Sequence, residues 1–370
     1  MENLKGACII GQSGGPTAVI NASAQGVIQT ALASDQITRV LGAAHGIKGV
    51  LADQLYDMSQ EDPAQLNLLQ FTPSSALGSC RYKLADPDVD DTDYQRILEV
   101  FKKYDVRYFF YNGGNDSMDT CNKISKYMQR VGYPCNIIGV PKTIDNDLDG
   151  TDHCPGYASA AKYIATSCME LYQDARVYDT GTVVIVEIMG HKVGWLALYA
   201  GIAGGADIIL LPEIPYDIDV VVNAIRSRTK NGKNFTILAV AEGAISKENA
   251  ALTKKELKEK KKNGPVYPSV AYELGAQISE RTGQEIRVTV PGHMQRGGEP
   301  CPYDRVIATR LGAEAAEMIR RKEYGYMVAL NNNKIEKIPL ADIAGKLKMV
   351  DPKSDIIREA KDVGISFGDE

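Results

Sequence analysis

Short apolar runs rich in β-branched residues alternate along the chain with longer segments whose apolar residues recur at helical spacing. Ala7–Gly11 and Asn136–Val140 are predicted buried strands, whereas Thr17–Ala33, rich in Ala, Val and Ile, is typical of a helix. Further strands are predicted over Arg107–Tyr111, Val183–Ile188, Asp207–Leu211, Thr236–Ala241 and Ile286–Val290. This alternation indicates an α/β fold with largely parallel sheets covered on both faces. Ligands of such folds bind beyond the carboxyl ends of the strands, which makes the turns after the strands the candidate sites.

Length and charge narrow the class of protein. The chain has 370 residues, a formal net charge of −5 and 44% hydrophobic residues, which fits a globular protein of two domains or one large α/β unit. The mildly acidic balance argues against nucleic-acid binding, which needs a basic face. No apolar run is long enough to span a bilayer, and the N-terminus carries no signal pattern, so we expect a cytosolic protein.

Two further patterns favour structural roles over chemical ones. The seven cysteines are scattered without any Cys-x-x-Cys, which indicates reduced thiols rather than disulfides or a zinc site. The basic segment Lys254–Lys262 is interpreted as a solvated helix end or a mobile excursion rather than as an anion-binding patch.

Two glycine-rich turns after strands are candidate phosphate sites. Gly11–Thr17 contains Gly14 and Gly15, which let a ligand approach the backbone, and it precedes a helix N-terminus that favours anions. Asn112–Ser117, with Gly-Gly followed by Asn, Asp and Ser, suits a phosphate or a magnesium phosphate. The alternatives are a purely conformational turn in the first case and a helix cap in the second.

The most specific pattern is Pro-Lys-Thr-Ile-Asp-Asn-Asp at 141–147. It places two carboxylates beside a lysine and a threonine at the end of a buried strand. One carboxylate can accept the proton of a hydroxyl nucleophile while the ammonium of Lys142 neutralises phosphoryl charge. A fourth cluster, Arg287 with Pro291–Gly298, adds His293 and Arg296 as donors suited to a phosphate ester.

Together these motifs resemble the phosphofructokinase family over nearly the whole chain, from Gly11 to about Arg320. The shared order is Gly-Gly-Pro-Thr, Gly-Gly-Asn-Asp-Ser, Pro-Lys-Thr-Ile-Asp-Asn-Asp, Met-Gly-His, Ala-Glu-Gly and Gly-His-Met-Gln-Arg-Gly-Gly. The resemblance implies two Rossmann-like α/β domains with the active site in the cleft between them. We expect the donor domain over 1–150 plus part of the C-terminal region, and the sugar-phosphate domain over 151–310.

In that family the 1-hydroxyl of fructose 6-phosphate attacks the terminal phosphoryl group of a donor. By resemblance Asp145 is the base, with Thr143, Asp147 and Lys142 at the reacting centre. Sugar-phosphate contacts are expected from Thr143, Ile144, Asp145, Met189, Gly190, His191, Glu242, Arg287, His293 and Arg296, and donor contacts from Gly14, Gly15, Arg81, Gly114, Asp116, Ser117 and Lys142. Because the family's equivalent of Arg287 acts across a subunit boundary, the resemblance also implies a homodimer or homotetramer.

Two positions indicate which donor is used. ATP-using members resemble one another in having glycines where this chain has Asp116 and Lys142. A side chain at Asp116 crowds and repels the α-phosphate of a nucleotide, and Lys142 can bind inorganic pyrophosphate. We therefore expect a glycolytic, pyrophosphate-dependent enzyme that uses Mg²⁺, with ATP as the alternative donor. A non-catalytic subunit is disfavoured because the base and the phosphate-binding residues are present.

Three departures from the family pattern carry further expectations. The usual magnesium-ligating Asp is replaced by Asn115, so either Asp116 shares in the metal shell or the donor oxygens and water hold the ion. His191 and Thr182 stand at positions where arginines are common in the family. These replacements leave open whether a longer sugar phosphate, such as sedoheptulose 7-phosphate, is also accepted. Gln25 and Gln29 replace two effector-binding arginines, which predicts no strong activation by ADP and no inhibition by phosphoenolpyruvate.

Overall fold

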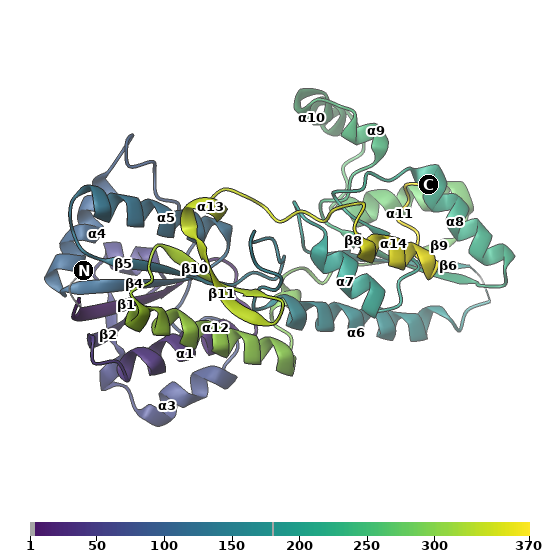
Figure 1. The fold of residues 1–370 in the computed structure, drawn as a ribbon. Coiled ribbons are helices and arrows are strands. Elements are labelled where there is room, and N and C mark those ends of the chain that lie inside the picture. Colours follow the sequence, from purple (N-terminus) through teal and green to yellow (C-terminus); the bar gives the residue numbers. More distant parts are fainter. Residues whose placement is uncertain (1–3, 180) are drawn as a thin grey trace. The chain divides into compact units, whose positions relative to one another are not determined.

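The computed structural model describes residues 4–179 and 181–370, and the chain forms two compact units. Unit 1 comprises the residues up to Ser159 together with Arg296–Lys348, and unit 2 comprises Ala160–Gln295 with Met349–Glu370. The chain therefore passes between the units three times. Each unit has its own sheet, of seven and four strands respectively among the described residues (Figure 1).

The sheet of unit 1 has the strand order β11-β10-β5-β4-β1-β2-β3. Its five central strands run parallel to one another, and the edge strands β3 and β11 are antiparallel to their neighbours. The strands are β1 (Gly6–Gln12), β2 (Ile37–Ala43), β3 (Leu55–Asp57), β4 (Val106–Gly113), β5 (Asn136–Pro141), β10 (Tyr326–Asn331) and β11 (Lys334–Pro339). Every residue of β1 and β5 is buried, as expected for central strands covered on both faces.

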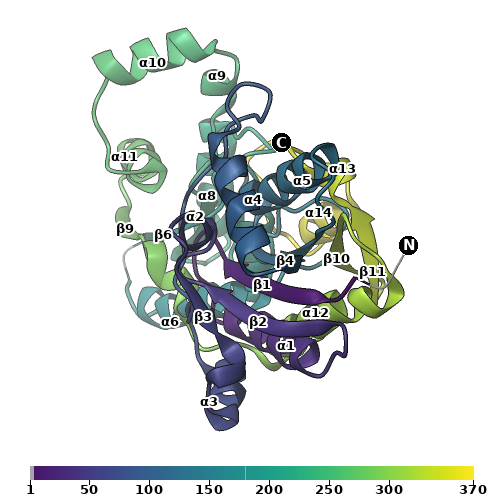
Figure 2. The ribbon, with the colours of Figure 1, turned by 90° about the vertical axis from the view of Figure 1, so that its left-hand side faces the viewer.

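Helices cover both faces of this sheet. Two of them, α1 and α12, lie on one face, and α4 and α5 lie on the other (Figures 1 and 2). The helices of unit 1 are α1 (Ile20–Leu32), α2 (Ile47–Leu51), α3 (Pro63–Leu68), α4 (Thr92–Lys103), α5 (Asn115–Arg130), α12 (Pro302–Arg321) and α13 (Leu340–Ile343), with short 3-10 turns η1 (Met58–Gln60) and η2 (Leu69–Phe71). Glycines let α1 and α12 approach closely, because a methyl carbon on Gly312 would lie 2.0 Å from the Ser23 carbonyl oxygen.

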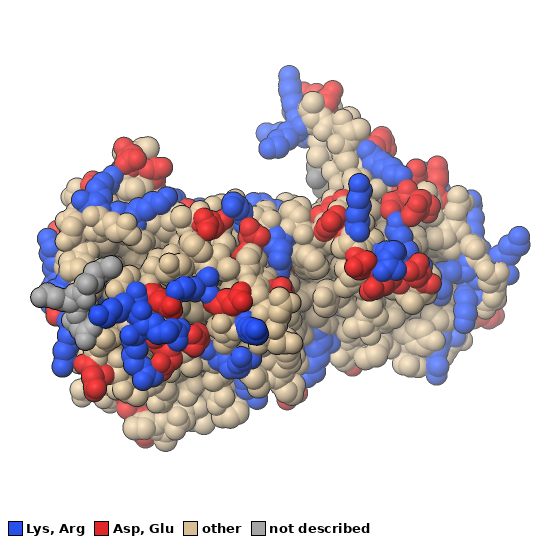
Figure 3. Space-filling model, viewed as in Figure 1, with Lys and Arg blue, Asp and Glu red and all other residues tan. Residues whose placement is uncertain are grey.

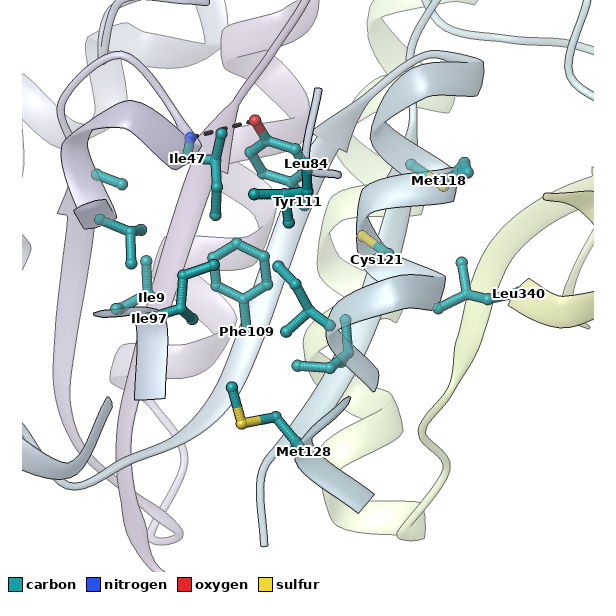
Figure 4. Packing of buried hydrophobic residues seen from close by; sticks show 14 of the residues in the cluster. Ile9, Ile47, Leu84, Ile97, Phe109, Tyr111, Met118, Cys121, Met128 and Leu340 are labelled. Carbon is teal, nitrogen blue, oxygen red and sulfur yellow. Dashed lines mark hydrogen bonds between the residues drawn. The ribbon is translucent and has the colours of Figure 1, made fainter. Parts of the chain in front are cut away.

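The core of unit 1 follows from the two-residue period of its strands. Along β1, Cys8 and Ile10 pack toward α1 and α12, whereas Ile9 joins the cluster on the opposite face. Figure 4 shows Phe109 at the centre of that second cluster, with Ile9 and Ile97 nearby. These side chains are fully buried, so they hold the sheet rigid beneath the loops at its carboxyl edge.

Unit 2 contains an all-parallel sheet with the order β7-β8-β6-β9. Its strands are β6 (Thr182–Ile188), β7 (Ile208–Leu210), β8 (Phe235–Ala241) and β9 (Glu285–Thr289). Its helices are α7 (Trp195–Ala203), α8 (Ile218–Lys230), α9 (Lys247–Ala250), α10 (Lys254–Asn263), α11 (Val270–Thr282) and α14 (Asp355–Asp362). Helix α6 (Tyr157–Ala175) and the 3-10 turn η3 (Gly292–Arg296) each begin in one unit and end in the other.

The basic segment Lys254–Lys262 is helical. Helix α10 starts with a capping box in which Thr253 and Glu256 bond reciprocally. Apart from half-buried Leu257, residues 254–260 are exposed, and blue lysine side chains surround this part of the surface in Figure 3. The prediction of a solvated helix is therefore confirmed.

The seven strands predicted from the sequence are present, each with ends within two residues of the prediction. The α/β class with largely parallel sheets is thus confirmed. All seven cysteines are free thiols, and five of them are buried. Within residues 4–179 and 181–370, no helix is long and apolar enough to cross a membrane.

Candidate active site

Three of the predicted site loops follow neighbouring strands of unit 1. Strands β5, β4 and β1 are adjacent and parallel, so the turns after Gln12, Gly113 and Pro141 meet at the carboxyl edge of one sheet. The strand order reverses there, because the chain continues from β1 to β2 on one side and from β4 to β5 on the other. Open α/β sheets bind ligands at this kind of switch point.

Lys142 connects the loops after β5 and β1. Its side chain is almost completely buried, and its ammonium donates to the Gly15 carbonyl oxygen over 2.6 Å. Gly14 has a left-handed φ of 78°, and its carbonyl accepts a hydrogen bond of 2.5 Å from the Ser79 hydroxyl. The glycine loop is therefore fixed from both sides, and a buried cation lies directly beside it.

The charge on Lys142 is costly in this position. Burial and, secondly, the charge of Arg296 lower the pKa of Lys142 to about 8, and Arg81 acts in the same direction. The carboxylates of Asp145 and Asp147 oppose this shift. A bound anion would compensate the cations, so this corner of unit 1 is chemically suited to phosphate.

The turn after β5 presents the two candidate carboxylates. The Asp145 amide donates to Thr143 Oγ1 over 3.1 Å, and Thr143 is bridged to Gly156 on a neighbouring segment. Between the aspartates, Asn146 has a left-handed φ of 54°. Asp145 and Asp147 are half-buried, whereas Ile144 is buried, with 4% of its surface exposed.

Asp147 is half-buried, and several groups surround its carboxyl. Burial raises the pKa of its carboxyl, while hydrogen bonds with the Thr143 and Asn115 side chains and the charge of Lys348 act in the opposite direction. Lys348 also binds this turn through its backbone, since its amide donates to the Asp147 carbonyl oxygen over 3.0 Å. Asp147 is consequently positioned by groups from three segments of unit 1.

The loop after β4 leads into α5 with Gly114 as its N-cap. Ser117 is buried, and its amide donates to the Gly114 carbonyl oxygen over 3.0 Å. Asp116 is exposed and forms an ion pair of 2.9 Å with Lys83, which is also exposed. Asp116 thus places a carboxylate, paired with the ammonium of Lys83, at the start of α5.

Asn115 offers an oxygen to a cation. Its Nδ2 donates to the Asp147 carbonyl oxygen over 3.3 Å, while its Oδ1 is buried and has no hydrogen-bond partner in the described part of the chain. A neutral amide oxygen is a weaker ligand for Mg²⁺ than a carboxylate, but the ion commonly keeps several waters and phosphate oxygens in its shell. The described residues contain no group of three or more His, Cys, Asp or Glu arranged to hold a metal. Asn115 therefore fits a magnesium ion held mainly by a phosphate ligand.

Unit 2 gathers other predicted residues at the carboxyl edge of its own sheet. Met189, Gly190 and His191 follow β6, and Glu242 and His293 follow β8 and β9. The Gly190 amide donates to Glu242 Oε1 over 3.4 Å, and Gly190 has a φ of 130° that favours glycine. His191, Glu242 and His293 are exposed, so their polar groups are accessible to a ligand.

Arg287 and Thr182 lie elsewhere on this sheet. Arg287 projects from β9 and forms ion pairs with Glu285 and Asp174, and its guanidinium lies 4.3 Å from the ring centroid of Tyr178. Thr182 is completely buried at the start of β6. Arg287 is thus held by partners within its own unit, and Thr182 has no exposed surface.

The structure also shows residues that the sequence reasoning missed. Lys83 pairs with Asp116, and Gln295, which is buried, accepts from the Met189 amide over 3.0 Å. Asn146 holds the turn after β5 through its side-chain amide, and Lys348 holds it through its backbone amide. Only Asn146 carried a local signal, because Asn is one of the few residues that tolerate a left-handed φ.

Comparison with known proteins gives a consistent result. A family model described as Phosphofructokinase matches residues 7–319. An "ATP-dependent 6-phosphofructokinase" from Spirochaeta thermophila is 40% identical over 364 residues, covering 96% of each chain. A "Pyrophosphate--fructose 6-phosphate 1-phosphotransferase" from Halomonas elongata is 37% identical and covers 94% of this chain and 86% of its own length.

Solved structures agree with the fold. A pyrophosphate-dependent phosphofructokinase from Nitrosospira multiformis superimposes with a TM-score of 0.85 at 33% identity, covering 97% of this chain and 92% of its own. One from Marinobacter aquaeolei gives a TM-score of 0.81 at 35% identity, with 95% and 88% covered. Because the family model spans residues 7–319 and a relative is 40% identical over 96% of the chain, the chain belongs to the phosphofructokinase family.

Proposed function

We propose that the protein is a pyrophosphate-dependent 6-phosphofructokinase. It transfers a phosphoryl group reversibly from pyrophosphate to the 1-hydroxyl of fructose 6-phosphate, as a cytosolic enzyme of glycolysis. The observation that supports this most is the buried ammonium of Lys142, 2.6 Å from the carbonyl oxygen of Gly15 in the glycine loop. Burying a lysine is unfavourable unless an anion or a carboxylate compensates its charge, and pyrophosphate is such an anion.

The reaction is in-line transfer, in which positioning and charge neutralisation lower the barrier. Asp145 takes the proton of the sugar hydroxyl, and Thr143 orients Asp145 by accepting from its amide. Asp147 lines the reacting centre. The donor is bound by Gly14, Gly15, Arg81, Gly114, Asp116, Ser117 and Lys142, and the sugar phosphate by Thr143, Ile144, Met189, Gly190, His191, Glu242, His293 and Arg296.

Mg²⁺ is the expected cofactor, and Asn115 is the residue that would hold it. When bound, the ion neutralises charge on the donor oxygens. The family resemblance also supports a homodimer or homotetramer in which Arg287 acts on the sugar phosphate of a partner. In that assembly Arg287 exchanges at least one of its present carboxylate partners for phosphate.

ATP is the second candidate donor. It is favoured by the relative from Spirochaeta thermophila, which is 40% identical to this chain and is described as ATP-dependent. Asp116 opposes it, because a carboxylate at the first turn of α5 repels the additional phosphate of a nucleotide. The pairing of Asp116 with Lys83 reduces this repulsion but fills the same region with two side chains.

The experiment is a comparison of donors. Purified protein with Mg²⁺ and fructose 6-phosphate is assayed for fructose 1,6-bisphosphate with pyrophosphate and with ATP. We expect activity with pyrophosphate, and an increase in ATP use in Asp116→Gly, alone or with Lys142→Gly. Lys83→Met is the control, because it breaks the ion pair and leaves the carboxylate in place. Activity with ATP alone would overturn the donor assignment, and sedoheptulose 7-phosphate is tested as a second acceptor.

A further inference from the structure

The His-Met-Gln-Arg motif is divided between the two units. His293 and Gln295 belong to unit 2, whereas Arg296 belongs to unit 1, so the chain crosses between Gln295 and Arg296. Gln295 is anchored in unit 2 by the Met189 amide. Arg296 is therefore the first residue of the motif to lie with the glycine loop and Lys142.

The position of Arg296 explains why residue 15 is a glycine. Unlike Gly14, Gly15 does not have a left-handed φ, so its backbone conformation is open to other residues. A methyl carbon placed on Gly15 would, however, lie 2.5 Å from Cζ, 2.7 Å from Nε and 2.8 Å from one terminal nitrogen of Arg296. The guanidinium of Arg296 thus occupies the space directly over the donor loop.

A second cation flanks the same loop. The Lys142 ammonium donates to the Gly15 carbonyl oxygen over 2.6 Å, and a methyl carbon on Gly14 would lie 3.2 Å from it. Burial and the charge of Arg296 together lower the pKa of Lys142, with Asp145 and Asp147 acting in the opposite direction. Two like charges at one glycine pair are stabilised when an anion with several oxygens binds both of them.

We propose that Arg296 binds the phosphoryl donor, with its guanidinium on pyrophosphate beside Lys142, and not only the phosphate of the sugar. This inference rests on the proposed function. A guanidinium can donate two parallel hydrogen bonds to phosphate oxygens, which the point charge of Lys142 cannot do. Arg296 would then hold the orientation of pyrophosphate before the sugar binds.

The test measures donor binding without any acceptor. The full chain with Mg²⁺ is titrated calorimetrically with pyrophosphate, and in parallel with ATP, for wild type, Arg296→Gln and His293→Gln. We expect Arg296→Gln to weaken pyrophosphate binding by roughly tenfold to a hundredfold, as for the loss of a charged hydrogen-bond donor. His293→Gln should leave the affinity for pyrophosphate within about twofold of the wild-type value. Circular dichroism checks that each variant is folded.

Gly15→Ala provides an independent variant, because the added methyl group displaces a flexible side-chain end and not the backbone. If it acts through Arg296, the double variant Gly15→Ala, Arg296→Gln binds pyrophosphate no more weakly than Arg296→Gln alone. Unchanged affinity in Arg296→Gln, or an equal loss in His293→Gln, would overturn the inference. If wild type binds ATP and not pyrophosphate, the proposed donor is wrong, and the effect of Arg296→Gln on ATP affinity then decides the role of Arg296.

Discussion

The Cys154 amide donates to Asn146 Oδ1 over 2.9 Å, and Asn146 in turn has a left-handed φ of 54°. The amide nitrogen of the same side chain donates to the Asp152 carbonyl oxygen over 3.1 Å. Asn146 therefore fixes the turn that separates Asp145 from Asp147, and it does so without presenting a charge. In the Asp-Asn-Asp sequence the middle residue sets the geometry and the outer two supply the carboxylates.

Replacing Asn146 should destabilise unit 1. Asn146→Ala loses both side-chain hydrogen bonds and forces a left-handed φ on alanine, which lacks the polar side chain that lets asparagine tolerate it, for an expected loss of roughly 2–4 kcal/mol of unfolding free energy. Asn146→Gly keeps the φ and loses only the hydrogen bonds, so its loss should be smaller. Urea unfolding of the three proteins measures this difference. Equal stability of wild type and Asn146→Ala would show that the turn is held by other contacts.

Removing the proposed base should slow chemistry without preventing binding. In Asp145→Asn the backbone bond to Thr143 Oγ1 is retained, because the Asp145 amide makes it. We expect kcat to fall by roughly 10²–10⁴-fold, the usual contribution of a general base, with donor affinity changed little. Steady-state kinetics and titration with pyrophosphate measure the two quantities. Asp149→Asn, which removes a carboxylate from the same loop, is the matched control, and a similar loss of kcat in it would contradict the assignment.

The lowered pKa of Lys142 predicts a pH dependence of donor binding. Above about pH 8 the free enzyme loses the proton on Lys142, so its affinity for pyrophosphate should fall as pH rises from 7.5 to 9.5. Calorimetric titrations at several pH values measure this trend. Lys142→Arg stays charged throughout, so its curve contains only the titration of pyrophosphate itself. Parallel curves for the two proteins would exclude Lys142 as the titrating group.

The same group should also affect stability. Its folded-state pKa of about 8 lies below the ordinary lysine value of 10.5, so the unfolded chain binds more protons between these limits. The unfolding free energy of the ligand-free protein should therefore rise with pH through this window. Below pH 8 the lysine is charged in both states, so the full destabilisation caused by burying its charge is present there. Lys142→Met lacks this titration, so the unfolding free energy of wild type should rise relative to that of Lys142→Met as pH increases from 8 to 10.5. A constant difference would contradict the shifted pKa.

ADP and phosphoenolpyruvate should have little effect on the half-saturating concentration of fructose 6-phosphate. Gln25 and Gln29 are half-buried on α1, and Gln29 donates to Asn67 Oδ1 over 3.4 Å. Neutral amides provide no charge for a phosphorylated effector. Titration of ADP and of phosphoenolpyruvate should leave the half-saturating concentration of fructose 6-phosphate within about twofold of its starting value. A large shift with either compound would contradict this prediction.

The central strands could be predicted from the sequence because they are short, continuous and apolar. The four missed strands are edge strands or lie next to an edge, where the apolar pattern is weaker. Strand β11, for example, contains only exposed and half-buried residues. Its hairpin with β10 did carry a signal in Asn332 and Asn333, which have φ values of 50° and 63° at the turn.

The candidate site was predictable only where chemistry lies in short motifs. The turn of Lys142, Thr143 and Asp145 could be identified because its residues are contiguous. The ion pair of Lys83 with Asp116 joins residues 33 positions apart, and no periodicity in the sequence indicates it. Likewise the motif containing His293 and Arg296 is contiguous in sequence, yet its two ends belong to different units.

Alkylation of the buried thiols can report local opening of the protein. Burial raises the pKa of Cys8 and Cys154 in unit 1 to about 12 and that of Cys168 in unit 2 to about 11, so these thiols are unreactive while they remain covered. An alkylating reagent can modify them only when the surrounding structure opens. Mass spectrometry of the modified cysteines would thus give a separate opening rate for each unit. Donor binding should slow alkylation of Cys154, whose amide donates to Asn146 in the turn after β5, more than that of Cys168.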